Sequence, residues 1–168
     1  FWGPRNLAFY DSNLVVADTG KHRLAVFNRQ GAMVRSVGDK GELTGQFIEP
    51  VGLAVIGDRL YVADVGNQRV QVFDRNYAPV LEFGVLGWED QVGTEPYMTS
   101  DDQQTLWLTD SGKNRLQRYS AEGRLLGIYG PGASPTGPLS TPKGIAHFQG
   151  NLILGDFGKN RLLVWKIE

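Results

Sequence analysis

An all-β fold built from repeated four-stranded sheets is predicted by three observations on this chain of 168 residues. The pattern D-x-G-x-x-R, followed by Leu or Val, occurs four times at a constant spacing of 46 residues, starting at Asp18, Asp64, Asp110 and Asp156. Around each copy lie apolar segments that are too short to be helices. Glycine is abundant, at 22 residues, which is typical of many strands joined by tight turns. A fixed period of this length indicates a repeat architecture.

Each repeat is predicted to open at a proline and to contain four strands. In the second repeat, Pro50 precedes a first apolar segment at 52–55, and a second strand at 60–63 leads into Asp64. A third strand at 70–73 alternates apolar and polar residues with period two. The fourth strand is clearest at 33–37 and 125–129. The repeats span 1–46, 47–92, 93–138 and 139–168, and the last is expected to lack its fourth strand.

Four short antiparallel strands cannot bury both faces of their sheet alone, whereas sheets stacked around an axis can. The period therefore predicts a β-propeller segment, because a jelly roll or an immunoglobulin-like sandwich gives no reason for a 46-residue repeat. An open ring would expose strand edges. We therefore expect either further blades, to about six in all, or two self-associating chains that complete one ring of about eight blades.

The second repeat carries a family resemblance. Its residues FIEPVGLAV at 47–55, followed by LYVADVGNQRVQVFD at 60–74, resemble an NHL repeat. The resemblance extends over the whole chain and is weakest in the third repeat, which departs from the pattern at Met98, Ser100, Asp101 and Asp102. It implies a β-propeller. It does not fix the function, since the NHL family includes protein-binding platforms, RNA-binding domains, sensor domains and a lyase.

Composition excludes several classes of site and gives no sign of two kinds of partner. With 17 basic and 18 acidic side chains the net charge is −1, so bulk charge does not indicate binding to nucleic acid or to a membrane surface. The absence of cysteine excludes disulfides, thiolate metal sites and a cysteine nucleophile. No apolar run approaches the roughly 20 residues of a membrane-spanning helix, so this segment is not expected to insert into a membrane.

The charged residues of the repeated motif are predicted to be structural. The aspartate side chain should accept from backbone N–H groups two or three residues on, and the glycine should supply a positive φ. The arginine should return to the aspartate or to a neighbouring blade as a charge-assisted pair. This prediction covers Asp18, Arg23, Asp64, Arg69, Asp110, Arg115, Asp156 and Arg161.

Candidate binding residues are sought where the repeats differ. The residue after each opening proline varies, and Arg5, Tyr97 and Lys143 at this position are predicted near the mouth of the channel. His147 lies in a first strand and is expected to face the channel. Trp88 interrupts a connector in Gly87-Trp88-Glu89-Asp90 and is expected either to tuck under its own loop or to face a partner or sugar ring. A solvated rim is the alternative for Arg5, Tyr97 and Lys143.

No catalytic or metal-binding motif is evident. The lyase of this family resembles a zinc enzyme with several channel histidines, but this chain has only His22 and His147, in different structural positions. A catalytic zinc site typically needs three protein ligands. A calcium site built from channel oxygens at Asp101 and Asp102 is an alternative, although nothing there resembles a calcium loop. Neither a nucleophile elbow nor a phosphate loop is present. We therefore expect no metal, no cofactor and no catalytic residue in this segment.

The sequence favours a binding platform for a protein or carbohydrate ligand that is not catalytic on its own. From the family resemblance we expect a location outside the cytoplasm. One alternative is a channel-type lyase or lactonase whose active residues lie partly outside this segment. A second is an RNA-binding NHL domain, which would need a basic face with exposed aromatic residues. Here the aspartates of the motif offset the basic residues near them, so nucleic acid is the less favoured partner.

Overall fold

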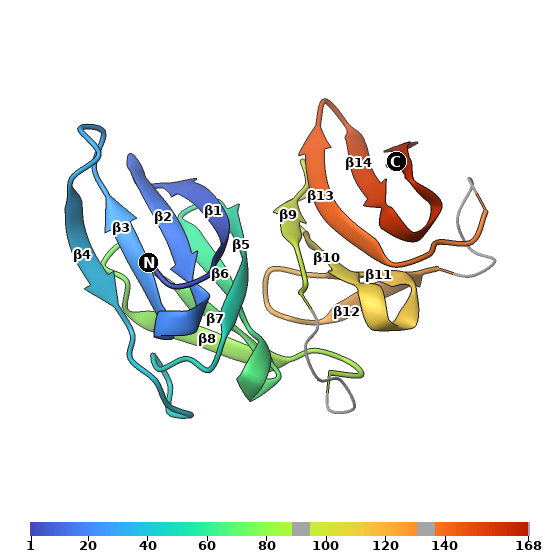
Figure 1. Cartoon of the computed structure of the whole chain (residues 1–168). Helices are drawn as coiled ribbons and strands as arrows, with labels where there is room; N and C mark the ends of the chain where they lie inside the picture. Colours follow the sequence, from blue (N-terminus) through green and yellow to red (C-terminus); the bar gives the residue numbers. More distant parts are fainter. Residues whose placement is uncertain (89–94, 131–136, 168) are drawn as a thin grey trace. The chain divides into compact units, whose positions relative to one another are not determined.

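The structure, a computed structural model, describes residues 1–88, 95–130 and 137–167. Its strands form four antiparallel sheets in which consecutive strands are neighbours (Figure 1). The chain divides into two compact units, Phe1–Val92 and Gly93–Glu168. Each unit contains two sheets, which we call blades and number in chain order.

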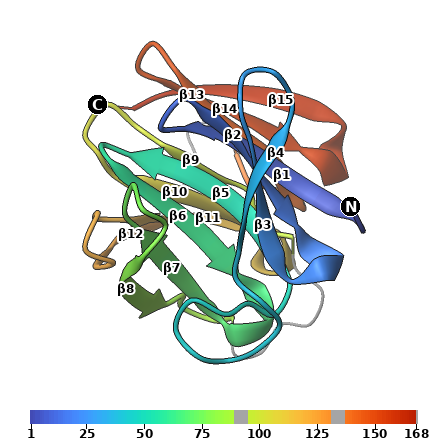
Figure 2. The same ribbon diagram turned by 90° about the vertical axis from the view of Figure 1, so that its left-hand side faces the viewer.

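The N-terminal unit contains the first two blades, with four strands in each. The first blade consists of β1 (Pro4–Tyr10), β2 (Asn13–Asp18), β3 (Arg23–Phe27) and β4 (Met33–Val37). The second blade consists of β5 (Pro50–Ile56), β6 (Arg59–Asp64), β7 (Arg69–Phe73) and β8 (Pro79–Gly84). In the rotated view of Figure 2, β5 to β8 follow one another in order across the second blade.

The C-terminal unit contains the third and fourth blades. The third blade consists of β9 (Met98–Ser100), β10 (Leu106–Asp110), β11 (Arg115–Tyr119) and β12 (Leu125–Tyr129). The fourth blade consists of β13 (Pro142–Phe148), β14 (Asn151–Asp156) and β15 (Arg161–Lys166). Among residues 137–167 this sheet has three strands, as the sequence predicted. The predicted all-β propeller of four repeats is thus confirmed.

A short 3₁₀ helix joins the second and third strands of every blade and lies on the repeated motif. These helices are Thr19–Lys21, Val65–Asn67, Ser111–Lys113 and Phe157–Lys159. Each ends at a residue with left-handed backbone, such as Gln68 with φ of 58°. No helix among the described residues is long and apolar enough to cross a membrane.

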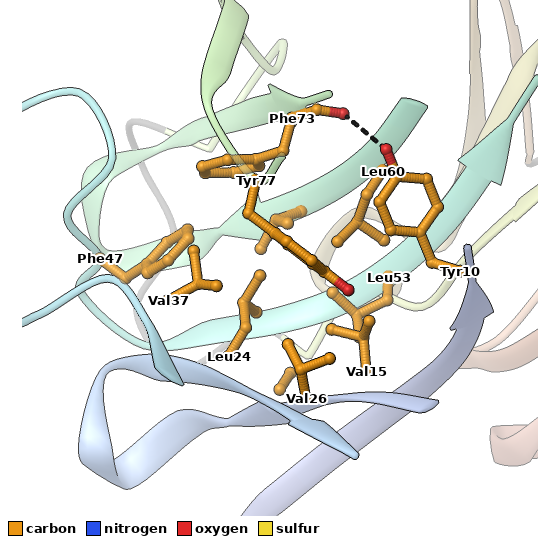
Figure 3. Close-up of a cluster of buried hydrophobic side chains, with 12 residues drawn as sticks. Tyr10, Val15, Leu24, Val26, Val37, Phe47, Leu53, Leu60, Phe73 and Tyr77 are labelled. Carbon is orange, nitrogen blue, oxygen red and sulfur yellow. Dashed lines mark hydrogen bonds between the residues drawn. The ribbon is translucent and has the colours of Figure 1, made fainter. Parts of the chain in front are cut away.

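A single apolar core joins the two blades of the N-terminal unit. The first blade contributes Val15, Leu24 and Val26, and the second contributes Leu60 and Phe73, all of them buried (Figure 3). Sheets with two apolar faces need such partners, because face-to-face packing is what removes those side chains from water.

The hydroxyl of Tyr10 crosses from the first blade to the second. It donates to the carbonyl of Asp58 at 2.8 Å and approaches the carbonyl of Phe73 at 3.4 Å (Figure 3). Burial is the main cause that raises the pKa of Tyr10 to about 12, and the nearby Tyr77 adds to it. Tyr10 therefore satisfies its polar atom while its ring packs in the core.

The C-terminal unit has its own core, in which aromatic rings take a larger share. Trp107 of the third blade and Leu152 and Leu154 of the fourth are buried there. Trp107 packs against Tyr129 and Trp165, with ring centroids 4.9 and 5.8 Å away. This core fixes the third blade against the fourth.

Candidate functional site

The aspartate and arginine of the repeated motif form an ion pair in all four blades. In each pair the Nε of the arginine lies 2.6 to 3.0 Å from the Oδ2 of the aspartate, and the aspartate side chain is fully buried. The pairs are Asp18–Arg23, Asp64–Arg69, Asp110–Arg115 and Asp156–Arg161. These carboxylates are thus closed to a ligand in solution.

The other carboxylate oxygen binds the connector that enters the blade. It accepts a backbone N–H from a residue 16 positions earlier: Trp2 to Asp18 at 2.8 Å, Ile48 to Asp64 at 2.8 Å and Ser140 to Asp156 at 2.6 Å. A bond to the turn itself, which the sequence predicted, is absent at these three aspartates. Asp110 alone makes it, to the N–H of Lys113 at 3.3 Å. In these three turns the N–H two residues after the aspartate, that of Gly20, Gly66 or Gly158, donates instead to a carbonyl of the connector.

The glycine of the motif is required by a close approach of two backbones. Gly66 donates its N–H to the carbonyl of Ile48 at 2.8 Å, and a Cβ on Gly66 would lie 2.8 Å from that oxygen. Gly20 and Gly158 stand in the same relation to their own connectors. The predicted positive φ lies instead two residues later, for example at Gln68.

Together, the aspartate and the glycine hydrogen-bond one connector residue at both its N–H and its carbonyl. We call this arrangement the connector clamp. It is described at Trp2, Ile48 and Ser140. Its hydrogen bonds fix the connector residue that precedes the first, second and fourth blades.

The clamp of the second blade is the most extensively bonded. Besides Ile48, the carboxylate of Asp64 accepts from Asn67 at 2.8 Å and from Arg69 and Gln71 at 3.0 Å. Burial raises the pKa of Asp64 above its ordinary value, although these donors act in the opposite direction. The carboxylate is held in place at a desolvation cost.

The predicted rim residues do not share one environment. Arg5 is exposed on β1 in the N-terminal unit. Tyr97, half-buried in the C-terminal unit, pairs its backbone with Thr109 just before β9. Trp88 is only 1% exposed, so its large apolar ring packs inside the protein and not on the rim. Trp88 is therefore not exposed to a ligand in this structure; Glu89 and Asp90 of its connector lie outside the described residues.

Lys143 and His147 both lie on β13. The ammonium of Lys143 sits 5.0 Å from the centroid of the Phe157 ring, a cation–π contact at the end of the blade. The Nε2 of His147 lies 3.5 Å from a carboxylate oxygen of Asp102, which is mostly exposed. His147 is thus paired with one carboxylate. Within residues 1–88, 95–130 and 137–167, no group of three or more metal-ligating side chains gathers.

A polar cluster inside the third blade was not predicted from the sequence. Asp101 is buried and accepts from the Thr105 hydroxyl at 2.6 Å, the Trp107 indole N–H at 2.8 Å and the Arg118 guanidinium at 2.8 Å. Burial raises the pKa of Asp101, but these hydrogen bonds and the Arg118 charge outweigh it and bring the pKa below its ordinary value.

A sequence signal for this cluster existed. Asp101 and Arg118 occupy positions at which the second repeat has Val55 and Val72. Polar residues at two apolar repeat positions distinguish the third blade from the second and are the sequence feature that indicates this cluster.

Beside this cluster the C-terminal unit has an open pocket of about 320 Å³. Its walls are aromatic and cationic: Trp107, Arg118, Tyr129, Trp165, Lys166 and Ile167. The Arg118 guanidinium lies 5.0 Å from the centroid of the Trp107 ring, and its bonds to Asp101 and Thr105 fix it there. Lys166 is exposed. Aromatic walls with a fixed guanidinium and an exposed ammonium can bind a ligand that presents both apolar faces and hydrogen-bond acceptors.

One family model matches part of the second repeat. Residues 47–73 match the family model described as NHL repeat. The chain carries an NHL repeat in a β-propeller fold. A search of curated protein sequences finds no match. The matched residues are those on which the sequence analysis based its resemblance.

Solved structures resemble this chain in fold. Virginiamycin B lyase from Staphylococcus aureus has a TM-score of 0.70 at 15% identity, over 98% of this chain and 56% of that one. A streptogramin B lyase has a TM-score of 0.65 at 16% identity, over 96% and 53%. BamB from Moraxella catarrhalis has 0.61 at 12%, over 97% and 43%. This chain spans about half the length of these proteins. At such identities the likeness shows the fold alone.

Proposed function

We propose that this chain belongs to a non-catalytic binding platform whose ligand is a carbohydrate. The observation that carries the proposal is the aromatic and cationic pocket of the C-terminal unit. Sugar rings present apolar C–H faces that stack on indole and phenol rings, while their hydroxyls accept hydrogen bonds from cationic side chains. Trp165 and Lys166 bring these two properties together on neighbouring positions.

The burial and pairing of the motif aspartates support a binding function over a catalytic one. The four motif aspartates are buried and paired with arginine, so they are not available as general acids or bases. Asp101 is likewise surrounded by donors that favour its charged form. A protein segment is the other ligand class for such a platform, but a pocket walled by three aromatic rings suits a sugar better.

The test begins with a glycan array probed with the labelled chain, followed by calorimetric titration of any oligosaccharide that binds. We expect saturable binding that weakens at least about tenfold in Lys166→Glu and in Trp165→Ala. Lys21→Glu is the matched control, since Lys21 is an exposed lysine of the N-terminal unit. Lys166→Glu keeps the test valid if Trp165→Ala does not fold. An affinity that is unchanged in both pocket variants, or no binding to any glycan, would contradict the proposal.

A lyase is the second candidate, supported by the fold shared with virginiamycin B lyase and by the His147–Asp102 pair. A histidine beside a carboxylate is the arrangement of many general bases. Incubation of the chain with virginiamycin B, followed by mass spectrometry, tests this candidate. Product that forms with the native chain and not with His147→Ala would favour it over the binding platform.

A further inference from the structure

Two apolar sheet faces of this chain are exposed to solvent. The first, which we call the leading face, belongs to the first blade and consists of Phe1, Leu7, Phe9, Leu14, Val16 and Phe27. The second, the trailing face, belongs to the fourth blade and consists of Phe148, Ile153, Gly155, Leu162 and Val164. Phe9 is 77% exposed and Leu162 is 75% exposed. Apolar patches of this kind mark interaction surfaces.

The N-terminal unit shows how a leading face is covered. In the second blade the positions equivalent to the leading face are Phe47, Leu53, Val55, Leu60, Val62 and Phe73. These residues pack into one core with the opposite face of the first blade, formed by Tyr10, Val15, Ala17, Leu24 and Val26 (Figure 3). A leading face is therefore built to receive the trailing face of another blade.

The fourth blade exposes such a trailing face. Its trailing face occupies the same repeat positions as the five residues of the first blade that cover the second: Phe148, Ile153, Gly155, Leu162 and Val164 replace Tyr10, Val15, Ala17, Leu24 and Val26. The leading face also has a hollow of about 430 Å³, lined by side chains that include Phe1, Phe9 and Phe27. Leu24 and Val26, the first-blade equivalents of Leu162 and Val164, share a core with the leading-face positions of the second blade.

Beside each of these faces lies one partner of a hydrogen bond that joins neighbouring blades elsewhere in the chain. Each 3₁₀ helix ends at a residue with left-handed backbone. Where two blades meet within a unit, the side chain of this residue in the first of them accepts a hydrogen bond from a backbone N–H of the other, at the residue just before the proline that opens its first strand. Asn114 accepts from Thr141 at 2.6 Å, and His22 accepts from Glu49 at 3.2 Å. The equivalent residues at the two exposed faces are Asn160 and Gly3. Gly3 has φ of 63°, close to the 57° of Glu49 and the 51° of Thr141, so its backbone already has the required conformation.

We propose that a second copy of this chain docks on these faces, with the trailing face of one copy packed on the leading face of the other and Asn160 accepting the N–H of Gly3. A second copy is the occupant because a single chain carries both complementary faces. The contact is head-to-tail, so two copies can close a ring through two identical junctions or continue as a longer chain. It reproduces between molecules the blade contact that each unit contains.

Sedimentation of two single-face variants tests the proposal. Phe9→Asp disables the leading face and Leu162→Asp disables the trailing face, and both side chains are too exposed for either change to unfold a blade. We expect the native chain to form dimers or longer assemblies at micromolar concentration, and each variant alone to be monomeric. An equimolar mixture should form a heterodimer, because the intact leading face of one variant meets the intact trailing face of the other. Leu43→Asp, at a connector residue that is 71% exposed, should associate like the native chain.

Other outcomes overturn the proposal. A native chain that stays monomeric across the concentration range means that the two faces meet within one molecule or do not meet. A mixture that stays monomeric, or one variant that associates as the native chain does, would indicate a like-with-like contact or non-specific adhesion. Asn160→Ala should raise the dissociation constant of the assembly several-fold relative to the native chain. Non-specific adhesion would not respond to this change.

Discussion

Replacing Asp64 by alanine removes the acceptor on which the second connector clamp depends. Four donors converge on this buried carboxylate, and three of them keep another acceptor after the change. Asn67 keeps the carbonyl of Gly41, Gln71 keeps that of Gln46, and Arg69 keeps Glu82 and two carbonyls. The N–H of Ile48 loses its acceptor, in a part-buried position.

The expected cost follows from these contacts. An unsatisfied N–H costs about 1–3 kcal/mol, and a lost charge-assisted bond to Arg69 adds about 1.5–3 kcal/mol. Against this stands the desolvation that raises the pKa of Asp64, because that cost disappears with the carboxylate. We therefore expect Asp64→Ala to lower the free energy of unfolding by about 1–3 kcal/mol.

Equilibrium urea denaturation at pH 7, followed by far-ultraviolet circular dichroism, measures this change. The transition midpoint should fall while the slope with urea stays constant. Asp58→Ala is the control, because the side chain of Asp58 is exposed. Asp64→Asn should cost as much as the alanine change, since its amide nitrogen would face donors. A loss below about 0.5 kcal/mol, together with loss of ligand binding, would reverse the structural assignment of the clamp.

Four further outcomes follow from the structure. Gly66→Ala should cost about 1–3 kcal/mol of stability by thermal denaturation because its Cβ meets a backbone carbonyl, whereas Gly84→Ala, which has open space around it, should cost little. The pKa of Tyr10 is raised to about 12, so the native chain should lose stability as the pH rises from about 10 to 12. Tyr10→Phe should lose less over this range, with the remaining loss coming from Tyr77, whose pKa is also raised by burial. The pKa of Asp101 is lowered, so the stabilisation that Asp101→Asn removes at pH 7 should shrink as the pH falls below about 4. Elemental analysis should find no stoichiometric zinc, and zinc lost in His147→Ala would contradict this.

The fold could be predicted from the sequence because each strand is encoded locally and the encoding is repeated. The predicted fourth strands at 33–37 and 125–129 coincide with β4 and β12. The partner of each motif aspartate could not be predicted in the same way. That partner lies 16 residues earlier in an irregular connector, and no local rule links the two.

The candidate site was predicted less well than the fold, for a physical reason. Exposure depends on what packs over a residue, and the sequence does not reveal this for a connector. Trp88 illustrates the limit, since it interrupts a polar connector and is nevertheless buried. Asp101 and Arg118 illustrate the converse, because each lies in an apolar repeat position and only the structure shows that they pair.

The connector clamp also has a consequence for how the chain folds. Each clamp closes a loop of 16 residues, and every strand pair within a blade is a hairpin between neighbours in the chain. Short loops cost little entropy to close, and all-β proteins fold slowly mainly when their contacts join distant parts of the chain. We therefore expect each blade to nucleate from local contacts. A blade emerging from the ribosome then has most of its own interactions within reach before the next blade is made.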